Sequence, residues 1–122
     1  MSKVAVVACV YNSYPIVKQF LEALFEKSST SVHVVLINQH SPDEQTRNAL
    51  EVIKEKGDCR IPSVVLDPGK NIGTHNGFNF GFEIGVVDNG FDYIVKLDDD
   101  TIITTKDWDK LMVAGLEARP DI

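Results

Sequence analysis

The sequence alternates four times between a short apolar run and a segment of helical periodicity, and no other feature constrains the fold as strongly. Val4 to Val10 is a continuous, valine-rich run, which is typical of a strand buried on both faces of a parallel sheet. Three further strands are predicted at His33 to Asn38, Ile61 to Asp67 and Tyr93 to Leu97. Because helix-length segments connect the strands, the predicted fold is α/β, an open and mostly parallel sheet with flanking helices.

Start and stop signals bound the predicted helices. Ser13 is the expected N-cap of the first helix, and Ser41 to Glu44 fit a capping box for the second, which Gly57 would end. The third helix is expected over about residues 74–87, closed by Asn89-Gly90, and Thr105 is expected to cap the last one. The side chains expected to face the sheet in the first helix are Ile16, Val17, Phe20, Leu21, Leu24 and Phe25, and in the last helix Trp108, Leu111, Met112, Gly115 and Leu116 recur at helical spacing.

Size and charge exclude several classes of function. A chain of 122 residues with 43% hydrophobic content suits a single domain, and its net charge of -6 offers no basic surface for nucleic acid or an anionic membrane. No apolar stretch approaches the ~20 residues of a membrane span, and no signal peptide is recognisable. We therefore expect a cytoplasmic protein, at most peripheral at a membrane, with Cys9 as a buried core thiol.

Each predicted strand ends in polar residues. Tyr11 and Asn12 follow the first strand, Asn38 ends the second, Asp67 the third, and Asp98-Asp99-Asp100 follow the fourth. In open α/β sheets, ligands bind beyond the carboxyl ends of the strands, near the point where the strand order reverses. Asn and Asp also favour turns, so each residue alone fits a turn as well as a ligand contact.

The acidic run is the strongest candidate for a functional site. Three adjacent carboxylates repel each other, and each must be solvated, protonated or paired with a cation. Oxygen ligands of this kind suit Mg²⁺ or Mn²⁺, which keep several waters and share phosphate oxygens of a substrate. A bridging metal would let this acidic protein bind a phosphate ligand, whereas the alternative is a solvated acidic turn.

A glycine-rich segment, Gly69 to Gly77, opens the third predicted helix. Free backbone N–H groups at a helix start favour anions, but the segment lacks the Walker A pattern and the glycine spacing of a dinucleotide fingerprint. Gly77, Gly81 and Gly85 fall on one helical face, which predicts close packing of this helix against the sheet.

Taken together, these residues resemble a family 2 glycosyltransferase of the GT-A fold. The resemblance runs from about residue 3 to residue 118. It rests on Val10-Tyr11-Asn12, Ile37-Asn38-Gln39-His40-Ser41-Pro42-Asp43, Asn71-Ile72-Gly73 with Asn76, and Lys96-Leu97-Asp98-Asp99-Asp100 as the DxD motif.

The resemblance implies a nucleotide-diphospho-sugar-binding domain over residues 1–122, with a uridine diphosphate sugar as the first choice of donor. The implied donor-binding residues are Tyr11, Asn12, Asn38, Asn71, Gly73, Asn76, Asp98 and Asp99. Asp100 would bind Mn²⁺ or Mg²⁺ directly, and Asp98 would reach the ribose or a metal-bound water. Asn38 departs from the family, which usually has an aspartate there to bind the base.

The same resemblance implies inverting transfer to an acceptor that the sequence does not identify. The acceptor-binding half and the catalytic base of the family follow the DxD motif, and only one further helix is predicted after Asp100. The catalytic residues therefore stay unknown, and we favour a segment of a longer enzyme. Two alternatives stay open: a non-catalytic nucleotide or sugar binder, and a Mg²⁺-dependent phosphotransfer domain.

Overall fold

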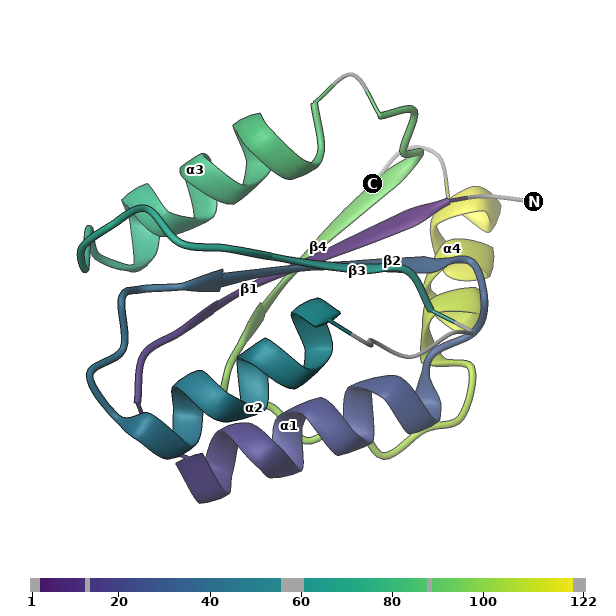
Figure 1. Cartoon of the computed structure of the whole chain (residues 1–122). Coiled ribbons are helices and arrows are strands. Elements are labelled where there is room, and N and C mark those ends of the chain that lie inside the picture. The colour runs from purple at the N-terminus through teal and green to yellow at the C-terminus, as the bar shows by residue number, and fades with distance from the viewer. Residues whose placement is uncertain (1–2, 13, 56–60, 88, 120–122) are drawn as a thin grey trace.

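A computed structural model describes residues 3–12, 14–55, 61–87 and 89–119. Strands and helices alternate along the whole chain, as the sequence predicted (Figure 1). In chain order the elements are β1 (Val4–Val10), α1 (Tyr14–Lys27), β2 (Val32–Asn38), α2 (Glu44–Glu55), β3 (Ser63–Leu66), α3 (Thr74–Gly85), β4 (Tyr93–Asp98) and α4 (Trp108–Ala118).

The four strands form one parallel sheet in the order β3-β2-β1-β4. Val4 pairs with Val32 on one side and with Tyr93 on the other, so β1 lies in the interior. The chain moves outward from β1 to β3 and then crosses back to place β4 on the other side of β1. The strand order therefore reverses between β1 and β4, and the predicted α/β fold is confirmed.

Helices cover both faces of the sheet, with α3 on one face and α1 and α2 on the other (Figure 1). Alternate residues of β1 point to opposite faces, which is why Val6 packs with α1 while Val7 packs on the α3 side. Phe20, Leu24 and Trp108 belong to the larger of the two cores. The continuous apolar run of β1 thus results from burial on both faces.

Glycines let α3 lie close to the sheet. A Cβ at position 81 would overlap Ile37 Cδ1, and one at position 85 would lie 2.8 Å from Val35 Cγ1. No side chain larger than hydrogen fits there without displacing the strand residues. The close packing predicted from the glycine spacing is therefore present.

Three successive hydrogen bonds attach the start of α4 to the last residue of α1 and the two residues after it. Asp107 N donates to Lys27 O (2.7 Å), Trp108 Nε1 to Ser28 Oγ (2.9 Å), and Ser29 N to Asp109 Oδ1 (2.9 Å). Asp109 is only 1% exposed, and Ser29 Oγ donates to its second carboxylate oxygen. These bonds set the rotation of α4 about its axis.

That rotation turns outward most of the apolar residues that recur at helical spacing in α4. Leu111, Met112 and Leu116 are 62%, 47% and 38% exposed. Trp108 alone of that stripe is buried, and Val113 packs beside it. The hydrogen-bonded Asp109 takes the inward position, which turns the predicted stripe outward. Ile16 of α1 is likewise exposed, whereas the rest of its stripe packs in the core or against it.

Two predicted caps are also wrong. Asp43, and not Ser41, caps α2, because its Oδ2 accepts from Thr46 N at 3.1 Å and α2 begins at Glu44. Asp107, with φ 54°, precedes α4 in place of Thr105 and makes no side-chain cap. Strand β3 and helix α3 are shorter than predicted, and α3 ends at Gly85 before Asn89-Gly90. Ser13 and Gly57 lie outside the described residues.

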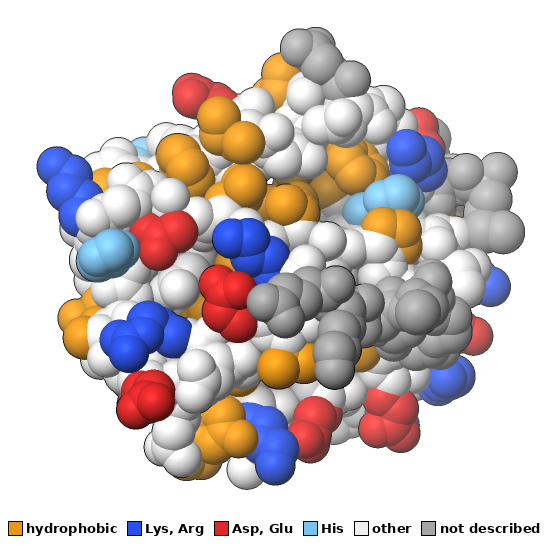
Figure 2. Space-filling model, in the orientation of Figure 1, with side chains coloured by type: hydrophobic (Ala, Val, Ile, Leu, Met, Phe, Trp, Pro, Cys, Tyr) orange, Lys and Arg blue, Asp and Glu red, His pale blue; other side chains and the backbone are white. Residues whose placement is uncertain are grey.

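Charged side chains of both signs are dispersed over the surface. On the face that Figure 2 shows, the Lys and Arg side chains of the described residues lie apart from one another, and several have acidic neighbours. Acidic residues outnumber basic ones in the sequence, which gives the net charge of -6. Within the described part of the chain, none of the helices has the length and apolar character needed to cross a membrane.

Candidate functional site

A cavity of about 450 Å³ lies at the carboxyl ends of β1 and β4, where the strand order reverses. Residues 9–11 at the end of β1 and residues 96–100 at the end of β4 form two of its walls. Gln39 comes from the end of β2, and Asn71, Gly73, Thr74 and Phe78 come from the loop before α3 and from α3 itself. The rule for ligand sites in open α/β sheets points to this place.

The cavity brings together only part of the predicted donor site. The predicted donor and metal residues that line it are Tyr11, Asn71, Gly73, Asp98, Asp99 and Asp100. Asn12, Asn38 and Asn76 do not line it. Asp67 follows β3 at the edge of the sheet, where its carboxylate lies 3.3 Å from His40 Nδ1. It is not among the residues that line the cavity.

Asn12 and Asn38 use their side-chain oxygens to shape the loop between β2 and α2. Asn38 Oδ1 accepts from Ser41 N (3.0 Å), and Asn12 Oδ1 accepts from Asp43 N (3.1 Å). Asn12 has φ 53°, a left-handed conformation that Asn adopts more easily than most residues. The local role of asparagine in turns accounts for both positions.

The acidic run forms a tight turn after β4. Thr101 N donates to Asp98 O at 3.1 Å, and Asp98 and Asp100 are exposed on either side of the half-buried Asp99. Burial raises the pKa of Asp99 above its usual value, and the charges of Asp100 and Asp98 add to this rise. The backbone N–H of Tyr11, at the end of β1, favours the ionised form of the Asp99 carboxyl and so partly offsets the rise in its pKa.

The turn can supply part of a metal site. Among the described residues, no group of three or more His, Cys, Asp and Glu side chains is arranged to hold a metal ion. Asp98 and Asp100 are exposed at the cavity, while Asp99 is engaged with Tyr11. Two carboxylates fit Mg²⁺ or Mn²⁺ shared with phosphate oxygens and water, the usual arrangement for these ions.

Two small turns shape the loop between β3 and α3. Gly69 N donates to Asp67 Oδ1 (2.7 Å), and Gly73 N donates to Asn71 Oδ1 (2.9 Å). Gly73 has φ 84° and precedes Thr74 without a side-chain cap on α3. The first N–H groups of a helix have no partner within the helix, so a positive electrostatic potential faces the cavity here.

Several cavity residues had no role in the sequence interpretation. Gln39 is 3% exposed and lies against the Asn71–Gly73 loop. Cys9 was expected in the core but is half-buried at the cavity wall, where Sγ lies 3.7 Å from Thr74 O. Lys96 Nζ lies 5.4 Å from the centre of the Phe78 ring and is the basic side chain among the described lining residues.

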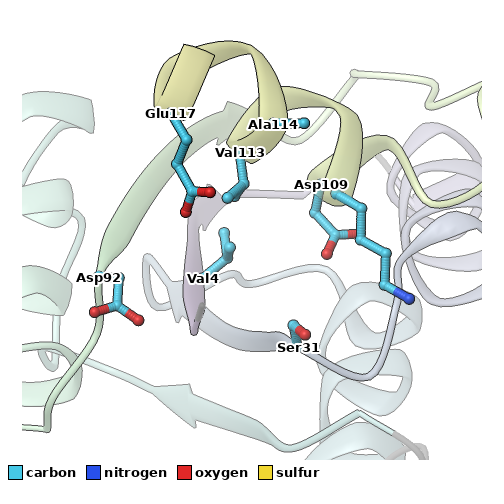
Figure 3. A pocket seen from close by; sticks show the side chains of 8 residues that line it. Val4, Ser31, Asp92, Asp109, Val113, Ala114 and Glu117 are labelled. Atoms are coloured by element: carbon cyan, nitrogen blue, oxygen red, sulfur yellow. The ribbon is translucent and has the colours of Figure 1, made fainter. Parts of the chain in front are cut away.

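A larger cavity, about 630 Å³, lies at the opposite end of the sheet (Figure 3). Val4, Ser31 and Asp92 line it together with Asp109 and Glu117 of α4. Asp109 already accepts two hydrogen bonds from Ser29, and none of the predicted site residues reaches this cavity. We therefore place the candidate site at the carboxyl ends of β1 and β4.

Comparison with known proteins identifies the family. The sequence matches Glycosyl transferase family 2 over residues 5–122. The chain belongs to this family. None of the curated proteins searched matches it.

Solved structures of similar fold agree with the membership of glycosyl transferase family 2. Residues 1–349 of S. aureus TarS superpose with a TM-score of 0.75 and 21% identity, and this structure has also been solved with UDP. The mannosyltransferase PcManGT from Pyrobaculum calidifontis, solved with GDP-Man and Mn²⁺, gives a TM-score of 0.77 and 16% identity. The matches cover 95% and 93% of this chain but 32% of each of those chains. The fold is that of the GT-A glycosyltransferases.

Proposed function

We propose that this chain is the donor-binding part of a metal-dependent glycosyltransferase that uses a nucleoside diphosphate sugar. The observation that carries the proposal is the position of Asp98, Asp99 and Asp100. They line a cavity at the reversal point of the sheet, in a chain that belongs to glycosyl transferase family 2. Family membership sets aside the phosphotransfer alternative.

Each wall of the cavity has a proposed task. Tyr11, 41% exposed at the end of β1, borders the pocket for the base, and Asp98 reaches the ribose or a metal-bound water. Asp100, with Asp98, holds Mn²⁺ or Mg²⁺, which would offset the negative charge that develops on the leaving diphosphate. Asn71 and Gly73, with the N-terminus of α3, face the phosphates from the other side.

Asn12, Asn38 and Asn76 stay in the proposed donor site as secondary contacts. Asn12 and Asn38 keep their side-chain Nδ2 groups for a ligand, since only their oxygens are used in the loop hydrogen bonds described above. Asn76 is exposed in the first turn of α3. All three would contact the donor only if it extends beyond the cavity.

The donor proposed first is a uridine diphosphate sugar. TarS has been solved with UDP, whereas PcManGT has been solved with GDP-Man and Mn²⁺, so both bases are included in the test. Inverting transfer to an acceptor would require a carboxylate base. The carboxylates among the described cavity residues are those of the acidic turn, and we assign no catalytic base.

The test measures the melting temperature with UDP, GDP, UDP-glucose and GDP-mannose, each with Mn²⁺, with Mg²⁺ or with EDTA. A ligand at 100 times its Kd stabilises a protein by about 2.7 kcal/mol, so binding gives a clear upward shift. We expect a shift that requires the metal and that Asp100→Ala abolishes. Asp107→Asn, outside the cavity, serves as the control variant.

The outcome decides between donor binding and another role. A folded wild-type protein that shows no metal-dependent shift with any of the four nucleotides would overturn the proposal. A second candidate is a non-catalytic nucleotide or sugar binder, which is supported by the lack of a carboxylate outside the acidic turn among the described cavity residues. Tight donor binding without hydrolysis or transfer to any sugar acceptor would favour it.

A further inference from the structure

Gln39 joins three segments that surround the candidate donor cavity. Its backbone N–H donates to Val10 O at 2.9 Å, which extends the pairing of β2 with β1. Its side chain reaches the loop before α3, where Nε2 donates to Gly73 O (2.8 Å) and Oε1 accepts from Ile72 N (3.1 Å). We call these two side-chain bonds the Gln39 bridge.

The bridge uses both ends of the carboxamide. Ile72 offers an N–H and Gly73 a carbonyl, so only one orientation of the amide satisfies both. The Cys9 side chain lies beside this amide, since both would contact a Cβ at position 77, and Gln39 partly offsets the rise that burial causes in the pKa of the Cys9 thiol. The side chain is 3% exposed, and none of the buried side-chain polar atoms among the described residues lacks a partner.

Gly77 provides the space that Gln39 occupies. A Cβ at position 77 would overlap Gln39 Nε2 and would lie 2.8 Å from Cys9 Sγ. Gly77 is in the first turn of α3, and its N–H donates to Gly73 O at 2.8 Å, the carbonyl that Gln39 also binds. With glycine at 77, the Gln39 side chain fits between the start of α3 and the end of β2 and reaches the Asn71–Gly73 loop.

From this geometry we propose that Gln39 is a positioning residue of the donor site. It acts by holding the Asn71–Gly73 loop and the uncapped N-terminus of α3 at the wall of the cavity. The inference rests on the proposed function, because it gives the loop a role in binding the donor phosphates. The proposed function names residues that touch the ligand. Gln39 would instead hold the loop that forms one wall of the cavity.

The primary variant is Gln39→Leu, which keeps an uncharged side chain of comparable volume and removes both side-chain hydrogen bonds. Gln19→Leu makes the same change on the exposed face of α1 and is the control. Two quantities are measured at a temperature where every variant is fully folded. They are the hydrogen-exchange rate of the Ile72 amide, and the Kd of UDP and of GDP with Mn²⁺.

In Gln39→Leu we expect the Ile72 amide to exchange roughly tenfold faster and the nucleotide to bind roughly tenfold more weakly, with Gln19→Leu unchanged. A purely structural role would lower the melting temperature and leave the Kd of the folded protein unaltered. If the exchange rate rises while the Kd stays the same, the positioning role is overturned. It is also overturned if neither quantity changes.

Gln39→Glu keeps the test decisive if the leucine variant does not fold. A protonated carboxyl can donate to Gly73 O and accept from Ile72 N, whereas the ionised form faces the carbonyl with a second acceptor. Burial disfavours the ionised form, so the variant should regain wild-type protection of Ile72 at about pH 4, below the ordinary glutamate pKa of ~4.3, and lose it at about pH 8, relative to wild type at each pH. Equal protection at both pH values would contradict the bridge.

Failure of the proposed function can be told apart from failure of the bridge. If the wild-type chain binds neither UDP nor GDP with Mn²⁺, the proposed function falls, and the positioning role falls with it. Exchange at Ile72 in the Gln39 variants still reports whether the bridge holds the loop. If the wild type binds and the variants bind equally well, only the positioning role is lost.

Discussion

The backbone N–H of Tyr11, at the end of β1, acts on the carboxyl of Asp99, in the turn after β4, and favours its ionised form. This interaction joins the two strands on either side of the reversal point in the sheet. The three adjacent aspartates differ in their surroundings, since Asp98 and Asp100 stay exposed at the cavity while Asp99 is half-buried. Of the three carboxylates, those of Asp98 and Asp100 are therefore the more accessible from the cavity.

The first prediction concerns the stability cost of Asp99. Its pKa in the folded chain is raised above the ordinary value of 3.8, first by burial and then by the neighbouring charges. The ionised carboxyl is therefore unfavourable in the folded state, and this penalty is present at neutral pH and disappears as the pH falls toward 3.8. Asp99→Asn keeps an oxygen for the Tyr11 N–H and removes the charge.

In EDTA, we expect Asp99→Asn to melt at a higher temperature than wild type at pH 7, with the difference shrinking steadily toward pH 4. Thermal unfolding by circular dichroism across this pH range measures it, and Asp107→Asn is the control. A lower melting temperature at pH 7 would show that the carboxylate itself stabilises the turn.

The second prediction compares two glycines in helices. Gly81→Ala places a Cβ on Ile37 Cδ1, and overpacking of a core of this kind costs about 1–3 kcal/mol. Gly115→Ala meets nothing within 4 Å on the exposed face of α4, so the higher helix propensity of alanine adds about 0.5–1 kcal/mol. Urea denaturation should separate the two variants in opposite directions from wild type. Similar midpoints for both would mean that α3 does not press against β2 as described.

The fold could be predicted from the sequence because its signals are local. The unbroken apolar run of β1 indicates burial on both faces, and the register of its pairs with β2 and β4 agrees with the strand ranges read from the pattern. The acidic run was placed correctly at the end of the fourth strand for the same reason. Strand ends and helix spacing do not depend on distant partners.

What the sequence did not reveal depends on contacts between distant residues. Asp109 is polar and was not expected inside, because its partner Ser29 lies 80 positions earlier in the chain. The same pairing turned Leu111, Met112 and Leu116 outward. Gln39 had no assigned role because its bridge reaches Gly73, 34 positions away. The only local signal of that bridge was a glycine, Gly77, inside a helix.

The third prediction tests the attachment of α4. Asp109→Ala leaves the N–H and hydroxyl of Ser29 without their acceptor. Both residues are buried, with Asp109 1% and Ser29 6% exposed. An orphaned buried polar group costs about 1–3 kcal/mol, so the urea midpoint should fall clearly. The exposed neighbour Lys110, changed to alanine, should stay within about 0.5 kcal/mol of wild type.

A double-mutant cycle with Ser29→Ala isolates the pair. Because both variants remove the same interaction, we expect the double variant to be less destabilised than the sum of the two single variants. Additive losses would show that Asp109 and Ser29 contribute independently. In that case the rotation of α4 would depend on the bonds from Asp107 N to Lys27 O and from Trp108 Nε1 to Ser28 Oγ.

The last prediction uses Cys9 as a reporter of the cavity. Burial raises the pKa of its thiol, Sγ faces Thr74 O, and the residue lines the cavity beside Gln39. The thiolate is the reactive form, so iodoacetamide should modify Cys9 at pH 8 more slowly than it modifies glutathione, and the rate should still rise at higher pH. The measurement requires a Cys59→Ser background, since the sequence has two cysteines.

UDP or GDP with Mn²⁺ should slow the reaction of Cys9 further if the nucleotide fills the cavity. Modification as fast as that of glutathione would mean that the wall at Cys9 opens freely to solvent, and bound nucleotide without protection would place the donor elsewhere.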